Sequence, residues 1–335
     1  MTTQLEQDLV AAIAPVLLER AEDGVDMGHV VREVAGAAAL RAAALGLGDT
    51  LPPEMGPDLA VDQLPRGLAV YVRRMSTSSH GTPAEFAARM KACGLRWIAL
   101  AGPWHELRDG RVRTGMMNPV ERIHAYGDAL EDAGIQVYVW GYPWLGHSEL
   151  FVEQIAAAAK WGRVLLDPEL GANPSKAATG SRKALANAEA ELVVRRCANA
   201  GVKVCGLSTF GNGYRIGWFP LVAYARALAE HFPGRSFIGG QTYTSNDAVD
   251  PSKADMLALI ARDRLEVELV PNFGLYKRVG AERTVKRRTA RDLLEHLQEF
   301  VDDPVPVRAL IGWAENFLHD ETEKALSRFD DAMEW

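Results

Sequence analysis

Eight short apolar runs, each followed by a helical pattern, constrain the fold of this chain more than any other feature. The runs are rich in β-branched and aromatic residues and cover 67–72, 96–100, 135–141, 163–167, 202–207, 235–240, 265–271 and 307–313. Such runs are typical of strands buried on both faces. Helices between them imply parallel pairing, because a parallel crossover needs a connection of about a dozen residues or more. The sequence therefore predicts eight consecutive β/α units.

Helix-capping residues support the same division independently of hydrophobicity. Thr82 and Asn118 each precede a proline and lie three residues before a glutamate, the pattern of an N-cap with proline at the first helical position. Four glycines each end a helical pattern immediately before a predicted strand, where a left-handed C-cap is needed: Gly94, Gly134, Gly162 and Gly201.

Eight units in roughly 250 residues match a (β/α)₈ TIM barrel. An open doubly wound sheet would instead carry a glycine-rich phosphate turn after its first strand, and the turn here reads RRMSTSSHG. The later GNGYRIG, residues 211–217, follows the fifth strand and is expected to be a loop. Before the barrel, an Ala- and Leu-rich stretch favours helices. We predict a helical N-terminal extension at 1–50, a proline-rich linker at 51–66 and the barrel at 67–335.

Composition excludes several classes of protein. The net charge of −7 lacks the basic excess of nucleic-acid-binding proteins. Three cysteines, all in helical or strand patterns, give neither a disulfide framework nor a metal knuckle, so we expect buried thiols. The first residues lack a cationic region, and acidic residues interrupt their apolar stretch. We therefore expect no signal peptide, no membrane span and a cytoplasmic product as synthesised.

Two carboxylates at the end of the fourth strand are the best candidates for catalysis, since barrel sites lie at the C-terminal ends of the strands. Asp167 and Glu169 are two residues apart, so in an extended segment both side chains project from one face. Close carboxylates raise each other's proton affinity, and glycoside hydrolysis requires one protonated and one ionised acid. A pair of surface or capping acids is the alternative. Glu315, after the eighth strand, is a third candidate that could face the pair across a substrate or cap the last helix.

Aromatic and amide residues gather at the other predicted strand ends. Sugar rings stack on aromatic side chains, and amides then fix their orientation, which favours a polysaccharide cleft. Packing of these residues beneath barrel-top loops is the alternative. The predicted substrate-binding residues are Trp104, Tyr142, Trp144, Gln241, Tyr243, Asn272 and Trp313.

The sequence predicts no metal and no cofactor. The first strand carries no HxH pair and no HExxH occurs, although His105, Glu106 and His147 could act as ligands or lie on loops. Residues 277–291 contain seven basic side chains and one acid. This segment could hold an anionic polymer such as peptidoglycan or teichoic material, or it could be a solvated loop with a helix start.

At 137–144 and 163–171 the chain resembles retaining glycosidase barrels that act on N-acetylhexosamine polymers. It looks most like the family 25 lysozymes of phages and bacteria, with the family 18 chitinase-like barrels as neighbours. Both families place a D-x-E motif at the end of strand four. The resemblance implies that Glu169 is the general acid and that Asp167 stabilises the substrate N-acetyl group or the developing positive charge.

Family 25 also carries an aspartate on strand one, where this chain has Val72, Arg73 and Arg74. Two hypotheses follow. The barrel binds and hydrolyses a β-linked polymer such as peptidoglycan, or it is a non-catalytic binding or structural component, for example of a phage-like particle, with a protein partner docked on the N-terminal helices.

Overall fold

The computed structural model describes residues 64–108, 111–143, 146–168, 181–210, 219–241, 260, 265–279, 284–301 and 307–333. The predicted N-terminal extension at 1–50 and nearly all of the predicted linker lie outside these ranges, as does the 211–217 loop.

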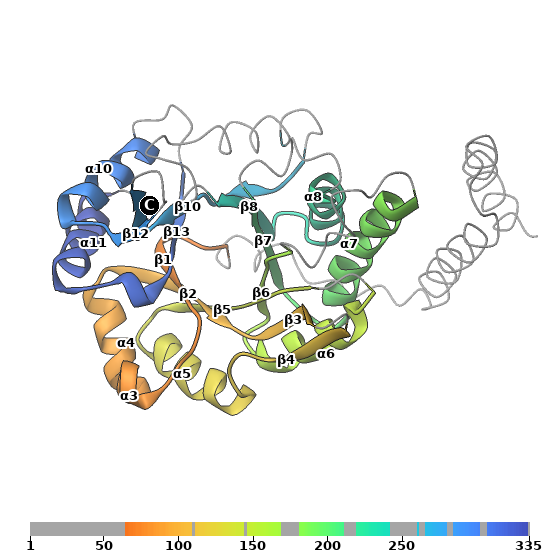
Figure 1. Ribbon diagram of the computed structural model, residues 1–335, viewed down its shortest axis with the longest axis horizontal. Helices are drawn as coiled ribbons and strands as arrows, with labels where there is room; N and C mark the ends of the chain where they lie inside the picture. Colours follow the sequence, from red (N-terminus) through yellow and green to blue (C-terminus); the bar gives the residue numbers. More distant parts are fainter. Residues whose placement is uncertain are drawn as a thin grey trace, which may run out of the picture.

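Eight parallel strands close into a barrel, which confirms the predicted fold (Figure 1). The ring closes because β10 pairs with both β13 and β8. The short β9 (Glu268–Leu269) also pairs with β8 and precedes β10, so the seventh predicted run forms an interrupted strand. In chain order the barrel strands are β1 (Gly67–Val72), β2 (Leu95–Ala101), β5 (Gln136–Gly141), β6 (Arg163–Leu166), β7 (Val204–Phe210), β8 (Ser236–Gln241), β10 (Asn272–Gly274) and β13 (Ala309–Trp313).

Helices surround the strands in Figure 1 and begin and end largely where the sequence indicates. Thr82 and Glu85 form the predicted capping box, and the four predicted C-cap glycines have φ values of 75, 82, 74 and 81°. The helices are α3 (Thr77–His80), α4 (Pro83–Ala92), α5 (Val120–Asp132), α6 (Ser148–Ala158), α7 (Ser181–Asn199), α8 (Leu221–His231), α10 (Ala290–Val301), the 3₁₀ helix η4 (Glu315–Phe317) and α11 (Asp320–Ala332).

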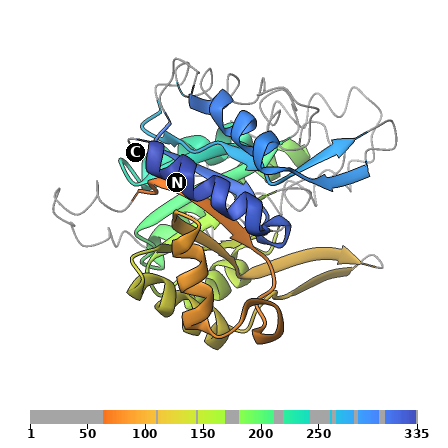
Figure 2. The same ribbon diagram turned by 90° about the vertical axis from the view of Figure 1, so that its left-hand side faces the viewer.

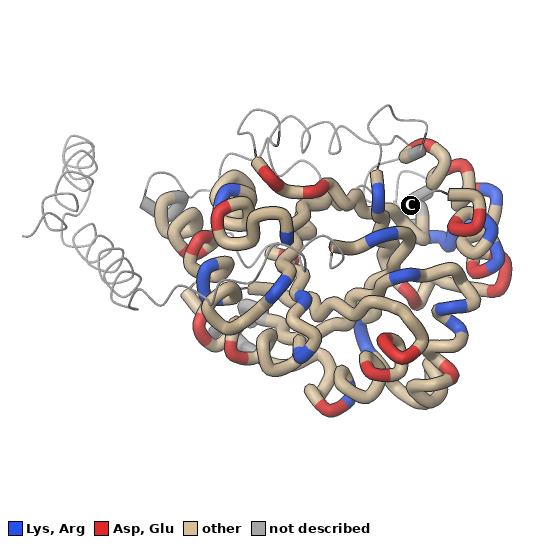
Figure 3. Tube along the Cα trace, turned by 180° about the vertical axis from the view of Figure 1, so that it is seen from behind, with Lys and Arg blue, Asp and Glu red and all other residues tan. Residues whose placement is uncertain are grey.

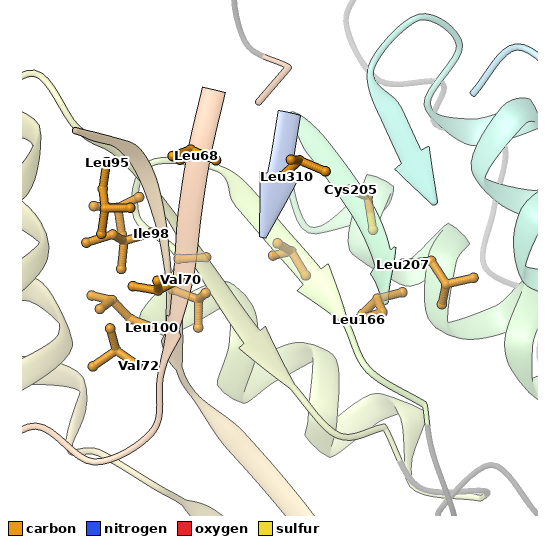
Figure 4. Packing of buried hydrophobic residues seen from close by; sticks show 14 of the residues in the cluster. Leu68, Val70, Val72, Leu95, Ile98, Leu100, Leu166, Cys205, Leu207 and Leu310 are labelled. Carbon is orange, nitrogen blue, oxygen red and sulfur yellow. The ribbon is translucent and has the colours of Figure 1, made fainter. Parts of the chain in front are cut away.

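Strand residues alternate between two hydrophobic layers. One set faces outward against the helices and includes Leu68, Val70, Val72, Leu166 and Leu310 (Figure 4). The other set fills the interior of the barrel. There Trp97, Tyr138 and Phe237 pack edge to face, with ring centroids 5.3 to 6.0 Å apart. A Cβ on Gly206 would lie 2.1 Å from the Phe237 ring, so only glycine leaves room for this packing.

Two β-hairpins extend the barrel and were not predicted. The first consists of β3 (Pro103–Arg108) and β4 (Arg111–Met116), and the second of β11 (Tyr276–Val279) and β12 (Thr284–Arg287). Both follow the C-terminal ends of barrel strands and project from the same end of the molecule (Figure 2). Of the two alternatives for 277–291, the loop with a helix start is wrong at 277–279 and 284–287, which pair as antiparallel strands, and right in that α10 begins at Ala290.

Basic residues lie at the starts of several barrel strands, at the opposite end from the hairpins. Arg96 pairs with Asp330 at 3.0 Å, and Arg163 pairs with Glu131 at 2.5 Å. Glu268 lies 3.9 Å from Arg66 and 3.7 Å from Arg308. Seen from behind, basic positions surround the ring of strands, whereas acidic positions lie mainly on the outer helices (Figure 3). Contacts at the N-terminal end of a barrel contribute to the stability of the fold, since the active sites of such barrels lie at the other end.

The sequence predicted Asn118 as the N-cap of α5, and this prediction is wrong. Pro119 occupies that position, and no side chain caps the helix. Asn118 is buried and instead connects the ends of β1 and β2. Its Oδ1 accepts a hydrogen bond from the Met75 N–H at 2.8 Å, and its Nδ2 donates to the carbonyls of Arg73 at 2.8 Å and Ala101 at 2.9 Å.

Replacing Asn118 by alanine should lower the free energy of unfolding by about 2–4 kcal/mol, because three hydrogen bonds are lost and buried backbone groups lose their partner. Urea denaturation measures this change. Asn199→Ala, at the exposed end of α7, is the matched control and should change stability by less than about 0.5 kcal/mol. Equal effects of the two variants would contradict the assigned role of Asn118.

A buried histidine of α10 forms a hydrogen bond with the backbone of β10. His296 on α10 is 6% exposed, and its Nε2 accepts a hydrogen bond from the Gly274 N–H at 3.5 Å. Arg288 donates from Nε to the Gly274 carbonyl at 2.8 Å. Burial, and secondarily the nearby Arg288 charge, lower the pKa of His296 from 6.5 to about 3. The imidazole is therefore neutral in the folded protein at neutral pH.

This low pKa predicts acid sensitivity. Between about pH 6.5 and pH 3 the unfolded chain binds a proton at His296 that the folded protein does not bind, so stability falls as the pH falls. The slope from this group approaches about 1.4 kcal/mol per pH unit. His296→Gln removes the proton uptake. Urea denaturation at pH 7 and pH 4.5 should therefore show that the free energy of unfolding falls less in the variant than in the wild type as the pH is lowered. A stability difference that is the same at both pH values would contradict this prediction.

Candidate active site

Asp167 lies inside the barrel, directly beyond the C-terminal end of β6. Its backbone N–H donates to the Gly141 carbonyl at 2.9 Å, so the strand pairing continues through this residue. Leu165 belongs to the interior layer, and the alternation of a strand directs Asp167 to the same side. The Asp167 side chain is 1% exposed, and its Oδ1 accepts a hydrogen bond from Gln241 Nε2 at 3.2 Å.

Other buried polar side chains from neighbouring strands lie at the same level. Asn272 Nδ2 donates to Ser208 Oγ at 2.7 Å and to the Tyr71 hydroxyl at 3.3 Å. We call Asp167, Gln241, Ser208, Asn272 and Tyr71 the polar layer. All five are nearly inaccessible to solvent. The structure thus brings together three residues that the sequence singled out: Asp167, Gln241 and Asn272.

An aromatic group adjoins the polar layer. The rings of Tyr71, Trp140 and Trp313 pack edge to face with centroids 5.1 to 5.7 Å apart, and Tyr142 lies 5.6 Å from Trp140. Trp313 and Tyr142 are partly exposed, whereas the other two rings are buried. The Trp140 indole N–H has no hydrogen-bond partner among the residues that the structure describes. This part of the barrel therefore presents partly accessible aromatic faces next to buried polar groups.

Sequence reasoning missed Tyr71 and Trp140 because it considered only residues at strand ends. Both lie within strands, Tyr71 near the end of β1 and Trp140 two residues before the predicted Tyr142. The alternation along β1 and β5 was the signal that could have identified them, since it assigns Tyr71 and Trp140 to the barrel interior.

The other predicted residues that the structure describes lie elsewhere. Trp104 lies on β3 of the first hairpin, opposite Gly115 on β4, rather than at the end of a barrel strand. Glu169, Trp144 and Tyr243 lie outside the described residues. His147 precedes α6 as its N-cap residue.

Glu315 opens η4 and is 8% exposed. Its Oε2 accepts the backbone N–H of Arg73 at 3.4 Å, and its Oε1 lies 3.6 Å from His80 Nε2. Among the described residues these contacts belong to the first β/α unit and not to the polar layer. The expectation that Glu315 faces Asp167 across a substrate receives no support from them, because the chain turns into η4 after Trp313.

Within the described ranges, no group of three His, Cys, Asp or Glu side chains is arranged to hold a metal ion. All three cysteines are buried free thiols, as expected. No helix in the described part of the chain is both long and apolar enough to cross a membrane.

Several solved structures that resemble this fold are glycoside hydrolases. A GH18 chitinase from Pseudoalteromonas aurantia matches with a TM-score of 0.53 and 9% identity, over 80% of this chain and 100% of that chain. A chitinase active domain 2 from Pyrococcus furiosus matches with a TM-score of 0.51 and 15% identity, over 81% and 97%. An endo-1,4-beta-mannanase from Rhizomucor miehei matches with a TM-score of 0.50 and 10% identity, over 80% and 94%. No known family profile and no curated protein matches the sequence. At these identities the likeness establishes the barrel fold.

Proposed function

We propose that this protein is a barrel glycosidase that binds and hydrolyses a β-linked N-acetylhexosamine polymer such as peptidoglycan, with Glu169 as general acid and Asp167 as its partner. The observation that carries the proposal is the burial of Asp167 in the polar layer, at the barrel end where such enzymes have their sites.

The burial of Asp167 separates the roles of the two acids. A carboxylate that is 1% exposed and bonded to Gln241 does not reach a leaving-group oxygen without a rearrangement, so it suits an electrostatic or orienting role. The proton donor must then be a second acid. Glu169 follows by two residues, and an extended chain would direct it to the same face, nearer the open end of the barrel.

The aromatic group beside the polar layer supports a saccharide ligand. Trp313 and Tyr142 are partly exposed and rest on buried rings, so they are rigid surfaces on which the apolar face of a sugar ring can stack. The buried amides Gln241 and Asn272 hold the polar groups beneath them in fixed positions. A stacked ring with its polar substituents directed toward these groups is the arrangement that carbohydrate sites use.

The choice of polymer rests on two supports. The D-x-E motif resembles that of enzymes acting on N-acetylhexosamine polymers, and two of the solved structures with this fold are described as chitinases. Chitin and peptidoglycan share the β-linked N-acetylglucosamine unit, so both are appropriate test substrates.

We expect the purified protein to release reducing sugar from chitin or peptidoglycan, and Glu169→Gln to lower that rate by about 10²-fold or more, since an acid catalyst contributes at least that much. Asp167→Asn should also lower the rate while stacking is retained, so the dissociation constant for a chitooligosaccharide should change less than the rate. Reducing-end assays and calorimetric titration provide the two measurements.

Glu153→Gln, on the exposed side of α6, and Asp331→Asn, on α11, are the matched controls and should leave the rate unchanged. Wild-type activity in Glu169→Gln would refute the assignment of the acid. Saccharide binding without any turnover by the wild type would instead favour the non-catalytic alternative.

A further inference from the structure

A pocket of about 700 Å³ lies beside the barrel mouth, between the end of β1, the α3–α4 segment and η4. Because Arg73 follows β1 and Asn316 follows β13, the pocket lies at the same barrel end as the polar layer. We call it the arginine pocket. Its lining residues are Arg73, Arg74, Ser79, His80, Phe86, Arg89, Met90, Glu315, Asn316 and Leu318.

Two of its cations have no acidic partner in the part of the chain that the structure describes. Arg73 and Arg74 are exposed, and no carboxylate of the described residues forms an ion pair with either guanidinium. The strand-start cations Arg96 and Arg163, at the other end of the barrel, pair with acids at 3.0 and 2.5 Å. With no carboxylate partner among the described residues, the guanidinium groups of Arg73 and Arg74 are available to bind an anion.

The charges of the pocket leave a single positive excess. Arg89 donates from Nε to Glu323 at 2.9 Å, so this pair is neutral. Glu315 contributes one negative charge, which lies 3.6 Å from His80 Nε2 and accepts the Arg73 backbone N–H. Counting only arginines and carboxylates, Arg73, Arg74 and Glu315 sum to one positive charge. A monoanion fits this balance better than a doubly charged phosphate, which Glu315 would repel more strongly.

The pocket adjoins the aromatic group through one contact. The guanidinium carbon of Arg73 lies 5.8 Å from the centroid of the Trp313 ring, a cation–π distance. The same ring packs against Tyr71 and Trp140 inside the barrel. A sugar stacked on Trp313 would therefore carry its substituents to within reach of Arg73.

We infer that the arginine pocket binds the carboxylate of an acidic sugar unit in the polymer held at the mouth. The inference rests on the proposed function and narrows its substrate to a polymer with carboxylated units. The planar guanidinium forms two parallel hydrogen bonds with a carboxylate, which gives the pocket selectivity for this group over neutral substituents.

A matched pair of disaccharides tests the inference. N-acetylglucosaminyl-N-acetylmuramic acid differs from N,N′-diacetylchitobiose chiefly by a lactyl ether that carries one carboxylate. Calorimetric titration of the full-length protein should give a dissociation constant about tenfold lower or more for the acidic disaccharide. In Arg74→Gln, and more strongly in Arg73→Gln/Arg74→Gln, the ratio of the two constants should fall toward one. Raising the salt concentration should reduce the same ratio.

Arg328→Gln, an exposed arginine of α11 outside the pocket, is the control and should keep the wild-type ratio. Thermal unfolding checks that each variant is folded. Equal affinity of the wild type for both disaccharides, or an unchanged ratio in the double variant, would overturn the inference and leave the proposed function standing. Competition by inorganic phosphate but not by the acidic disaccharide would overturn the carboxylate assignment. No binding of either disaccharide would refute the proposed function itself.

Discussion

The structure depends on filling the inside of the parallel barrel. Eight strands enclose a space that must be packed by the inward-facing half of their side chains, because an empty interior would forfeit dispersion contacts and leave a costly cavity. Here large rings do most of this packing. Trp97, Tyr138 and Phe237 fill one level, and Gly206 provides the space that the Phe237 ring needs. A rigid interior of this kind fixes the positions of whatever lies above it.

The polar layer depends on that rigidity. A buried carboxylate such as Asp167 is costly unless hydrogen bonds hold it, and Gln241 can supply one only if β6 and β8 keep their positions. Neither residue is near the other in the sequence, and the barrel brings them together from strands separated by β7. The packing of the interior and the chemistry at the mouth are therefore parts of one structure, and the helices around it mainly keep the strands closed.

The sequence predicted the repeating architecture well, because strand burial, proline starts and glycine stops are local signals. The capping box at Thr82 and the left-handed glycines are examples in which a few neighbouring residues decide the conformation. Prediction from the sequence failed where a side chain bonds to a partner far away in the chain. Asn118 has the pattern of an N-cap, yet its side-chain amide forms hydrogen bonds with three backbone groups, two just after β1 and one at the end of β2. The basic composition of 277–291 likewise did not predict the β11–β12 hairpin, because the pairing of its strands depends on backbone hydrogen bonds and not on side-chain charge.

The candidate site was predicted in part for the same reason. Position at a strand end identified Asp167, Gln241, Asn272 and Trp313, while Tyr71 and Trp140 required knowledge of which strand face points inward. Trp313 has a further consequence. Its ring packs against the interior aromatics, and its centroid lies 5.8 Å from the guanidinium carbon of Arg73. If a sugar ring stacked on Trp313 changes the affinity of Arg73 for a carboxylate, the carboxylate changes the affinity for the ring by the same factor. A single indole could thus couple recognition of a sugar ring to recognition of its charge.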